Sequence, residues 1–262
     1  MDKLKSNTIV VKVGTSTLAY ESGGINIRRV EKLVKVLSDI KNSGKNIILV
    51  TSGAISVGMG KLGIKTRPNC TKDKQALAAI GQCELMNYYQ RLFSEYNHKV
   101  AQVLLTKDVI KDKLRNENAA NTFEKLLDLS IIPIVNENDV ISTEQIEFGD
   151  NDTLSATVAT LIPTDLLVIL SDIDGLYDKN PKKEKDAKLI DIVYDITDDI
   201  KSIAGGATSS QGTGGMITKI HAAEIATQKG VDMLIVNGTN PEILYDIVEG
   251  KKVGTLFKAK NI

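Results

Sequence analysis

Short apolar runs alternate along the chain with longer segments in which apolar residues recur at helical spacing. The runs are rich in Val, Ile and Leu and occupy residues 9–13, 47–50, 100–105, 131–135, 166–170 and 233–236. Runs that are apolar at successive positions are typical of strands buried on both faces. We therefore predict an α/β fold with a mostly parallel sheet and helices on both of its sides.

The segment over residues 26–44 shows the helical spacing most clearly. Gly44 follows a series of apolar residues at Val30, Leu33, Val34, Leu37 and Ile40. This spacing predicts an amphipathic helix that ends at the glycine. Similar spacing predicts helices over residues 72–97, 115–129, 152–162, 216–229 and 241–249. The charged run over residues 182–188, directly after Pro181, predicts an exposed loop.

Composition narrows the class of protein. Hydrophobic residues make up 42% of the 262 residues, which argues against disorder. Lysine plus arginine and aspartate plus glutamate number 33 each, so no overall positive charge favours nucleic acid. No apolar run reaches the roughly 18 residues that a membrane span needs, and the start lacks a signal-peptide pattern. With only Cys70 and Cys83, we expect no disulfide framework. Together these features lead us to expect a cytoplasmic protein that binds neither a membrane nor nucleic acid.

Small and polar residues follow several of the predicted strands. These tails are GTST (14–17), TSGAIS (51–56), NENDVIS (136–142) and SDIDG (171–175). Each alone is also what an ordinary turn contains. Ligands of open α/β sheets bind at the carboxyl ends of the strands, where glycine and small hydroxyl residues let backbone N–H groups approach an anion. Because Lys12 lies in an apolar strand beside them, and a buried ammonium is costly without an anion, the tails together indicate one shared anion site.

A glycine-rich stretch, SSQGTGG (209–215), precedes the predicted helix over 216–229, which carries Lys219. A glycine-rich loop at a helix N-terminus can cradle phosphate, and the lysine adds a point charge. A flexible loop that ends in a helix cap is the alternative. No GK pair is followed by Ser or Thr, so the chain lacks a Walker A motif.

Three consecutive polar residues, Asp150, Asn151 and Asp152, stand at the start of the predicted helix over 152–162. Helix capping explains one or two of them. The surplus can hold an amino group, a lysine or a hydrated Mg²⁺ ion.

Three other patterns are disfavoured. GMGKLG (58–63) matches GxGxxG but begins several residues after its strand, so dinucleotide binding is not expected. SDIDG begins like a calcium loop, but Pro181 occupies the position of the bidentate glutamate. His98 and His221 lack metal-ligand spacing, and we predict no metal site made by protein side chains alone.

The polar tails also carry a family resemblance. VVKVGTSTL, VTSGAIS, VNENDVI, FGDNDTLSA, SDIDGLY and GTGGMITK resemble, in order and spacing, the motifs of glutamate 5-kinases in the amino acid kinase family. The resemblance extends from residue 8 to near residue 259. It implies a three-layer αβα sandwich with a central, mostly parallel sheet. It also implies transfer of the γ-phosphoryl group of ATP, with Mg²⁺, to the side-chain carboxylate of L-glutamate, the first step of proline biosynthesis.

Further expectations rest on the same resemblance. Many family members carry a C-terminal PUA domain, whereas the motifs here all belong to the kinase domain. We therefore expect a single amino acid kinase domain over residues 1–262, without a PUA domain. The resemblance further implies a homodimer or homotetramer and feedback inhibition by proline.

The resemblance implies roles for individual residues. The acceptor carboxylate is already ionised at neutral pH, so cations that bridge it to phosphate matter more than a general base. The catalytic residues implied are Lys12 on the transferred phosphoryl group, Lys219 on nucleotide phosphates and Asp152, which orients both lysines. Glutamate binding is implied for Ser52, Gly53, Asp139, Asn151 and Asp150. ATP binding is implied for Lys12, Gly14, Ser171, Asp172, Thr213, Gly214, Gly215, Met216, Ile217, Thr218 and Lys219.

Other functions stay open on the sequence alone. A related kinase can act on another carboxylate or on carbamate, although the NEND and GDND stretches together favour glutamate. A non-catalytic amino-acid sensor can share the fold, although both lysines and Asp152 are present. A nicotinamide-dependent oxidoreductase rests only on GMGKLG.

Overall fold

A single sheet runs through the protein in its computed structural model, which describes residues 7–20, 22–106, 109, 112–142, 151–181, 183–205 and 215–260. Within these residues the sheet has eight strands in the order β3-β4-β2-β1-β5-β7-β8-β6. The strands are β1 (Thr8–Val13), β2 (Asn46–Val50), β3 (Val100–Leu105), β4 (Ile132–Glu137), β5 (Leu166–Ser171), β6 (Ile192–Val193), β7 (Asp232–Asn237) and β8 (Thr255–Phe257).

Most neighbouring strands are parallel. The pairs from β3 through β7 run in the same direction, whereas β8 is antiparallel to β7 and β6 is parallel to β8. Every residue of β1, β4 and β5 is buried, as expected for strands covered on both faces. β1 lies between β2 and β5, and the three strands are parallel. The segments that follow them therefore lie close together at the carboxyl edge of the sheet.

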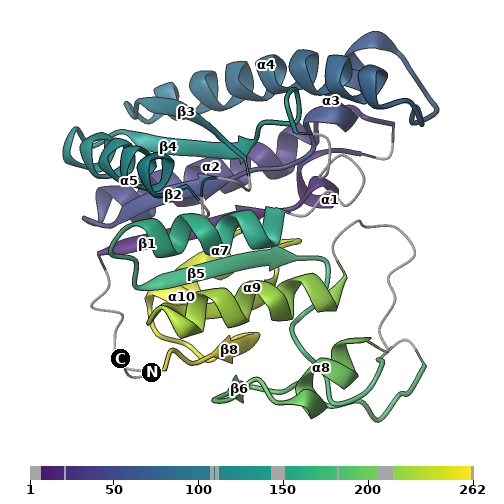
Figure 1. Cartoon of the computed structure of the whole chain (residues 1–262), viewed down its shortest axis with the longest axis vertical. Helices are drawn as coiled ribbons and strands as arrows, with labels where there is room; N and C mark the ends of the chain where they lie inside the picture. Colours follow the sequence, from purple (N-terminus) through teal and green to yellow (C-terminus); the bar gives the residue numbers. More distant parts are fainter. Residues whose placement is uncertain are drawn as a thin grey trace.

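Helices cover both faces of the sheet (Figure 1). One apolar core joins the sheet to α5, α7 and α9, and the other joins it to α2, α3, α4 and α10. The layers are therefore α, β and α. The helices are α1 (Thr15–Leu18), α2 (Ile27–Asn42), α3 (Ala54–Leu62), α4 (Thr71–Glu95), α5 (Lys113–Asp128), α7 (Asn151–Leu161), α8 (Asp198–Gly205), α9 (Met216–Gln228) and α10 (Ile243–Val248).

The expected fold class and its main elements are confirmed. Each predicted apolar run forms a strand and each predicted helix forms, with ends that differ by one or two residues. The helix α2 ends before Gly44, whose φ of +94° suits glycine. The described residues after Pro181 are mostly exposed, in agreement with the expected loop. The sequence patterns did not predict α1, α3, α8, β6 or β8.

Gly58, the first glycine of GMGKLG, serves helix packing. A Cβ at Gly58 in α3 would collide with the carbonyl oxygen of Leu77 in α4. A Cβ at Gly81 in α4 would collide in turn with the carbonyl oxygen of Ala54 at the start of α3. The backbones of α3 and α4 therefore touch directly, which brings the middle of α4 close to the end of β2.

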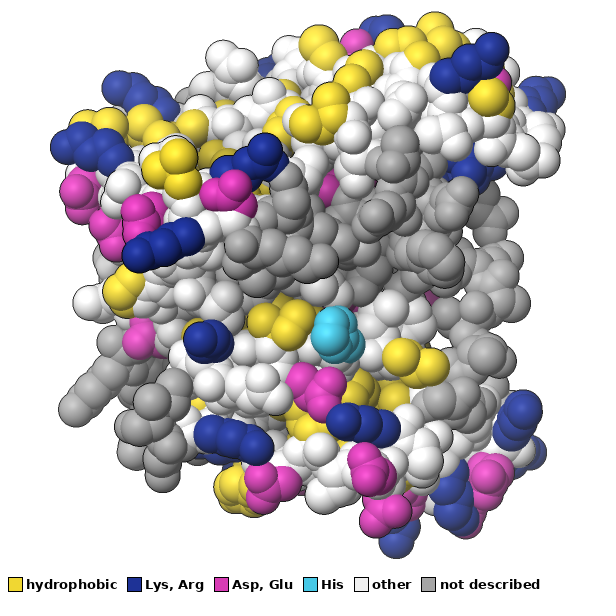
Figure 2. All heavy atoms as spheres, in the orientation of Figure 1, with side chains coloured by type: hydrophobic (Ala, Val, Ile, Leu, Met, Phe, Trp, Pro, Cys, Tyr) yellow, Lys and Arg dark blue, Asp and Glu magenta, His cyan; other side chains and the backbone are white. Residues whose placement is uncertain are grey.

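The surface drawn in Figure 2 carries charges of both signs, interspersed over the face toward the viewer. Cys70 and Cys83 are exposed and form no disulfide with each other. No helix in the described ranges is both long and apolar enough to cross a bilayer.

Candidate active site

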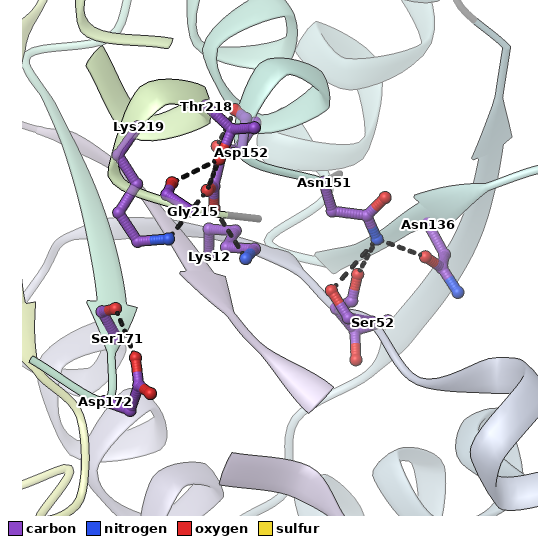
Figure 3. Close-up of polar contacts among 12 residues, drawn as sticks. Lys12, Ser52, Asn136, Asn151, Asp152, Ser171, Asp172, Gly215, Thr218 and Lys219 are labelled. Carbon is purple, nitrogen blue, oxygen red and sulfur yellow. Dashed lines mark hydrogen bonds and ion pairs between the residues drawn. The ribbon is translucent and has the colours of Figure 1, made fainter. Parts of the chain in front are cut away.

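Three of the predicted residues meet at the carboxyl edge of the sheet (Figure 3). Lys12 is in β1, Asp152 is in the first turn of α7, and Lys219 is in the first turn of α9. The Nζ atom of Lys12 lies 2.6 Å from Oδ1 of Asp152, and Nζ of Lys219 lies 3.0 Å from Oδ2. We call these three residues the lysine–aspartate cluster. They come from distant parts of the chain and converge because β1 is central in the sheet.

The lysine–aspartate cluster is almost closed to solvent. Asp152 is fully buried, and Lys12 and Lys219 are 8% and 6% exposed. Burial works to raise the pKa of Asp152, but the two ammonium groups outweigh it and hold that pKa below its usual range. With one carboxylate between two ammonium groups, the cluster has a surplus of positive charge. That charge makes the edge a site for a polyanion.

Thr218 also contacts Asp152. Its hydroxyl lies 3.0 Å from Oδ2 of Asp152 and 2.8 Å from the carbonyl oxygen of Gly215. Gly215 caps α9 without a side-chain hydrogen bond, which leaves the first N–H groups of the helix without a side-chain acceptor at the cap. Helix N-termini of this kind attract anions.

Two other glycines follow β1 and β2 at the same edge of the sheet. A Cβ at Gly14 would lie 3.8 Å from Nζ of Lys12, so the backbone passes close to the ammonium group. Gly53 caps α3 with a φ of +88°, in the left-handed region, and has no side-chain cap. A Cβ there would lie 3.1 Å from Cγ2 of Thr15. Both positions offer backbone groups near the ends of β1 and β2.

A chain of amide side chains forms a second group of polar contacts. Nδ2 of Asn151 donates to the carbonyl oxygen of Thr51, to Oγ of Ser52 at 3.2 Å and to Oδ1 of Asn136 at 2.7 Å. Nδ2 of Asn136 donates to Oε1 of Gln82 at 2.8 Å. We call Gln82, Asn136 and Asn151 the amide chain. It joins α4, β4 and α7 beside the end of β2.

Asn136 and Gln82 were not singled out from the sequence. Asn136 begins the NEND stretch, yet it is the second-to-last residue of β4 and only 2% exposed. An asparagine directly after an apolar run was the signal available in the sequence. Gln82 has no local signal, because its partner Asn136 belongs to another element far along the chain.

Asp139 lies two residues beyond β4, at the same edge of the sheet. It is half-buried. Burial raises the pKa of its carboxyl to about 6, against the opposing charge of Arg67. Asp139 is therefore a carboxylate whose charge changes near neutral pH.

The residues predicted for the nucleotide lie on the β5 and α9 side of Lys12 (Figure 3). Ser171 ends β5 and its hydroxyl donates to Oδ1 of Asp172 at 3.2 Å. In α9, Met216 is buried whereas Ile217 is 58% exposed. The predicted residues Asp150, Thr213 and Gly214 lie outside the described part of the chain.

Comparison with known proteins identifies the family of the chain. A model described as the amino acid kinase family matches residues 7–237. The chain is 56% identical to the glutamate 5-kinase of Clostridium perfringens over 259 residues, which cover 97% of this chain and 96% of that protein. It is 50% identical to the glutamate 5-kinase of Listeria innocua, with 97% and 94% covered.

Solved structures are similar in fold at much lower identity. UMP kinase from Bacillus anthracis matches with a TM-score of 0.65 and 16% identity, over 98% of this chain and 97% of that one. Isopentenyl phosphate kinase from T. acidophilum matches with a TM-score of 0.57 and 17% identity, over 96% and 100%. These likenesses concern the architecture alone.

Proposed function

Since the chain belongs to the amino acid kinase family and, within it, to the glutamate 5-kinases, we propose that it phosphorylates the side chain of L-glutamate. The γ-phosphoryl group of ATP passes to the side-chain carboxylate, which yields L-glutamyl 5-phosphate and ADP, the first step of proline biosynthesis. The observation that carries this proposal is the lysine–aspartate cluster at the carboxyl edge of the sheet. The identity to glutamate 5-kinases supports the choice of acceptor.

The reaction needs charge neutralisation more than proton transfer. A carboxylate oxygen of glutamate forms a bond to the γ-phosphorus as the bond from that phosphorus to the bridging oxygen breaks, and ADP keeps the electron pair. The acceptor has an ordinary pKa of about 4.3, so it is already ionised at neutral pH. The obstacle is repulsion between two anions, and the positive charge of Lys12 lies where it can reduce that repulsion.

Lys12 and Lys219 are proposed to bind different parts of the ATP phosphate chain. Lys12, in the central strand, contacts the oxygens of the transferred group, and Gly14 and Gly53 add backbone donors. Lys219 and the N-terminus of α9 hold the nucleotide phosphates. Asp152 keeps both ammonium groups in place through the contacts of 2.6 and 3.0 Å. When ATP binds, its negatively charged phosphates neutralise the surplus positive charge of the cluster.

The remaining nucleotide contacts are proposed from the family motifs. Ser171 ends β5 and Asp172 follows it, next to β1, on the side of the site where α9 begins. Ile217 offers an exposed apolar surface in the first turn of α9. The other proposed contacts are Thr213, Gly214, Gly215, Met216 and Thr218.

L-Glutamate is proposed to bind on the opposite side of Lys12, beside β2 and β4. Asp139 supplies a carboxylate for the α-ammonium group of the substrate. Ser52, Gly53 and Asn151 line the path to Lys12, and Asp150 adds a further carboxylate. The hydrogen bond between Asn151 and Ser52 shows that two of these residues share one location.

A Mg²⁺ ion is proposed to enter with the nucleotide. No group of three or more His, Cys, Asp or Glu side chains suited to a metal occurs in the described ranges. Asp152 is engaged by both lysines. The donor set therefore fits an ion held mainly by phosphate oxygens and water. When bound, the ion neutralises charge on the phosphates.

Three further properties are proposed from family membership. They are a homodimer or homotetramer, feedback inhibition by proline, and a cytoplasmic location. Each rests on the resemblance to glutamate 5-kinases.

A hydroxylamine-trapping assay with MgATP tests the reaction. Hydroxylamine converts an acyl phosphate to a coloured hydroxamate, and ADP release is followed in parallel. The acceptors are L-glutamate, L-aspartate, N-acetylglutamate and carbamate. We expect both signals with L-glutamate alone. ADP release with another acceptor instead would reassign the substrate, and no signal with any acceptor would contradict the kinase proposal.

A further inference from the structure

We propose that Gln82 in α4 is a positioning residue for L-glutamate. It acts through the amide chain, because its contact is with Asn136 and Asn136 in turn contacts Asn151. The proposal rests on the proposed function, since the ligand is the acceptor assigned there. It adds a residue from a helix that carries none of the proposed site residues.

Backbone groups determine which way the two asparagine amides face. The N–H of Glu137 can only donate, and it donates to the Asn136 side chain at 2.9 Å, so the atom there is the oxygen Oδ1. The carbonyl oxygen of Thr51 can only accept, so the Asn151 atom that faces it is Nδ2. The orientation of both amides therefore follows from the backbone around them.

This orientation creates a requirement that Gln82 meets. With Oδ1 of Asn136 turned to Glu137 and Asn151, its Nδ2 faces away from them and needs an acceptor. Oε1 of Gln82 is that acceptor, at 2.8 Å. Without Oε1 of Gln82, the buried Nδ2 of Asn136 would lose this acceptor. If the Asn136 amide rotated to find another acceptor, its Oδ1 would lose the contacts with Glu137 and Asn151.

Asn151, at the other end of the amide chain from Gln82, is the residue proposed to contact L-glutamate. Nδ2 of Asn151 is directed to Thr51, Ser52 and Asn136, and Figure 3 shows its Oδ1 on the opposite side, away from Ser52 and Asn136. An amide oxygen in that orientation can accept a hydrogen bond from the α-ammonium group of an amino acid. Gln82 thus helps to present an acceptor, rather than a donor, to L-glutamate.

The burial of Gln82 is not explained by packing alone. The residue is 8% exposed, and its Nε2 has no hydrogen-bond partner within the described residues. A buried donor without a partner lowers stability, and a methionine of similar length would avoid that loss. What the amide adds is the acceptor Oε1. The direct contact of Gly81 with Ala54 holds this turn of α4 against the end of β2.

The test compares Gln82→Met, which removes the acceptor, with Gln82→Glu, which keeps acceptor oxygens at the same position. Tyr89→Phe is the matched control, because it removes another buried hydrogen bond of α4, to Oγ1 of Thr51 at 2.8 Å. We expect Gln82→Met to raise the KM for L-glutamate about tenfold. We expect kcat and the KM for ATP to stay within twofold. Gln82→Glu restores the glutamate KM to within threefold of the unmodified protein, and Tyr89→Phe leaves it within twofold.

A double-mutant cycle separates action through Asn136 from a general loss of packing. If Gln82 acts through Asn136, Gln82→Met causes little further change in an Asn136→Ala background. Circular dichroism and thermal unfolding of each variant report folding. If Gln82→Met does not fold, Gln82→Asn takes its place with the same expectation, since it withdraws the amide from Asn136 by one methylene.

Three results would overturn the proposal. They are an unchanged glutamate KM in Gln82→Met, equal damage from Gln82→Glu, and full additivity with Asn136→Ala. All of them are read against an unmodified protein that forms glutamyl phosphate. If the unmodified protein gives no glutamate-dependent signal, the proposed function fails instead, so the two failures are distinguishable.

Discussion

Nζ of Lys12, in the apolar strand β1, lies 2.6 Å from Oδ1 of Asp152 at the start of α7. This contact explains how an ammonium group is tolerated in a buried strand. It also holds the ammonium group at the carboxyl edge, where the proposed phosphoryl transfer takes place. Because Lys219 shares the same carboxylate, Asp152 cannot neutralise both charges.

Replacement of Lys12 tests the charge that bridges the two anions. Lys12→Met removes the ammonium group and keeps most of the side-chain volume. We expect kcat to fall on the order of 100-fold or more, because an oriented group that stabilises charge in the transition state is lost. Steady-state kinetics with L-glutamate measures this. Lys32→Met, which removes an exposed lysine paired with Glu242, is the control and should leave kcat unchanged. Near-normal turnover in Lys12→Met would remove Lys12 from the mechanism.

Replacement of Asp152 tests the stability of the lysine–aspartate cluster. Asp152→Asn leaves two buried ammonium groups without their shared counter-ion. We expect the free energy of unfolding at pH 7 to fall by roughly 3–5 kcal/mol. Urea unfolding measures this. Asp246→Asn, in an exposed pair with Lys251, should change it by less than about 1 kcal/mol. Equal, small effects for both variants would mean that the cluster does not stabilise the fold.

The pH dependence of that stability has a defined sign. The folded pKa of Asp152 lies below its usual range, so the ionised carboxylate stabilises the fold at pH values above roughly 3.9. This contribution is lost as the pH falls from there toward the lower folded pKa. The difference in unfolding free energy between the unmodified protein and Asp152→Asn should therefore be constant from pH 7 to about pH 5 and shrink below about pH 4. A difference that grows as the pH falls would contradict this assignment.

Asp139 predicts a pH dependence of glutamate binding. Its pKa of about 6 means that the carboxyl becomes neutral as the pH falls below that value. A neutral carboxyl attracts the α-ammonium group of the substrate much less. The glutamate KM should then rise by up to about tenfold for each pH unit below about 6, while the KM for ATP changes little.

Asp139→Asn is the matching variant for this prediction. Its glutamate KM should be high already at pH 7.5 and nearly flat toward acid pH. Initial rates from pH 5 to 8 measure both proteins. The assignment fails if Asp139→Asn keeps the same pH profile as the unmodified protein.

Gly53 predicts an effect of backbone conformation on activity. Gly53→Ala places a side chain at a φ of +88° and 3.1 Å from Cγ2 of Thr15. Gly44→Ala is a matched control, with a φ of +94° and nothing within 4 Å of the added atom. Both should lose about 1–2 kcal/mol of unfolding free energy. Only Gly53→Ala should also lose activity, at least tenfold in kcat/KM for L-glutamate, because it shifts the turn beside Ser52.

Loss of activity in Gly44→Ala as well would attribute the effect to stability rather than to the turn. Unchanged activity in Gly53→Ala would remove this turn from the proposed site.

Sequence patterns predicted the parts of the fold that depend on local periodicity. The run that became β5 is apolar throughout, the run that became β1 is apolar except for Lys12, and α2 has a clear amphipathic spacing. The helix α3 was missed because its glycines are poor helix formers, and one of them, Gly58, serves contact with α4. The strands β6 and β8 span two and three residues, which is too short for periodicity to be visible.

The lysine–aspartate cluster could be predicted from the sequence, whereas part of the amide chain could not. Lys12, Asp152 and Lys219 stand in stretches that resemble a family, and the structure brings them together. Gln82 could not be found in this way, because its importance depends on a contact with β4 that only the tertiary structure creates. The local sequence around it is that of an ordinary helix.

The direct contact between α3 and α4 limits how the site can change shape. Where Gly58 and Gly81 meet the other helix, backbone touches backbone, and no layer of side chains exists there that could repack into a second arrangement. We expect α3 and α4 to move together as one rigid body, if they move at all. Among the described residues on the glutamate side, the mostly exposed connection between the two helices over residues 63–70, which carries Arg67 toward Asp139, can move without a change in their contact.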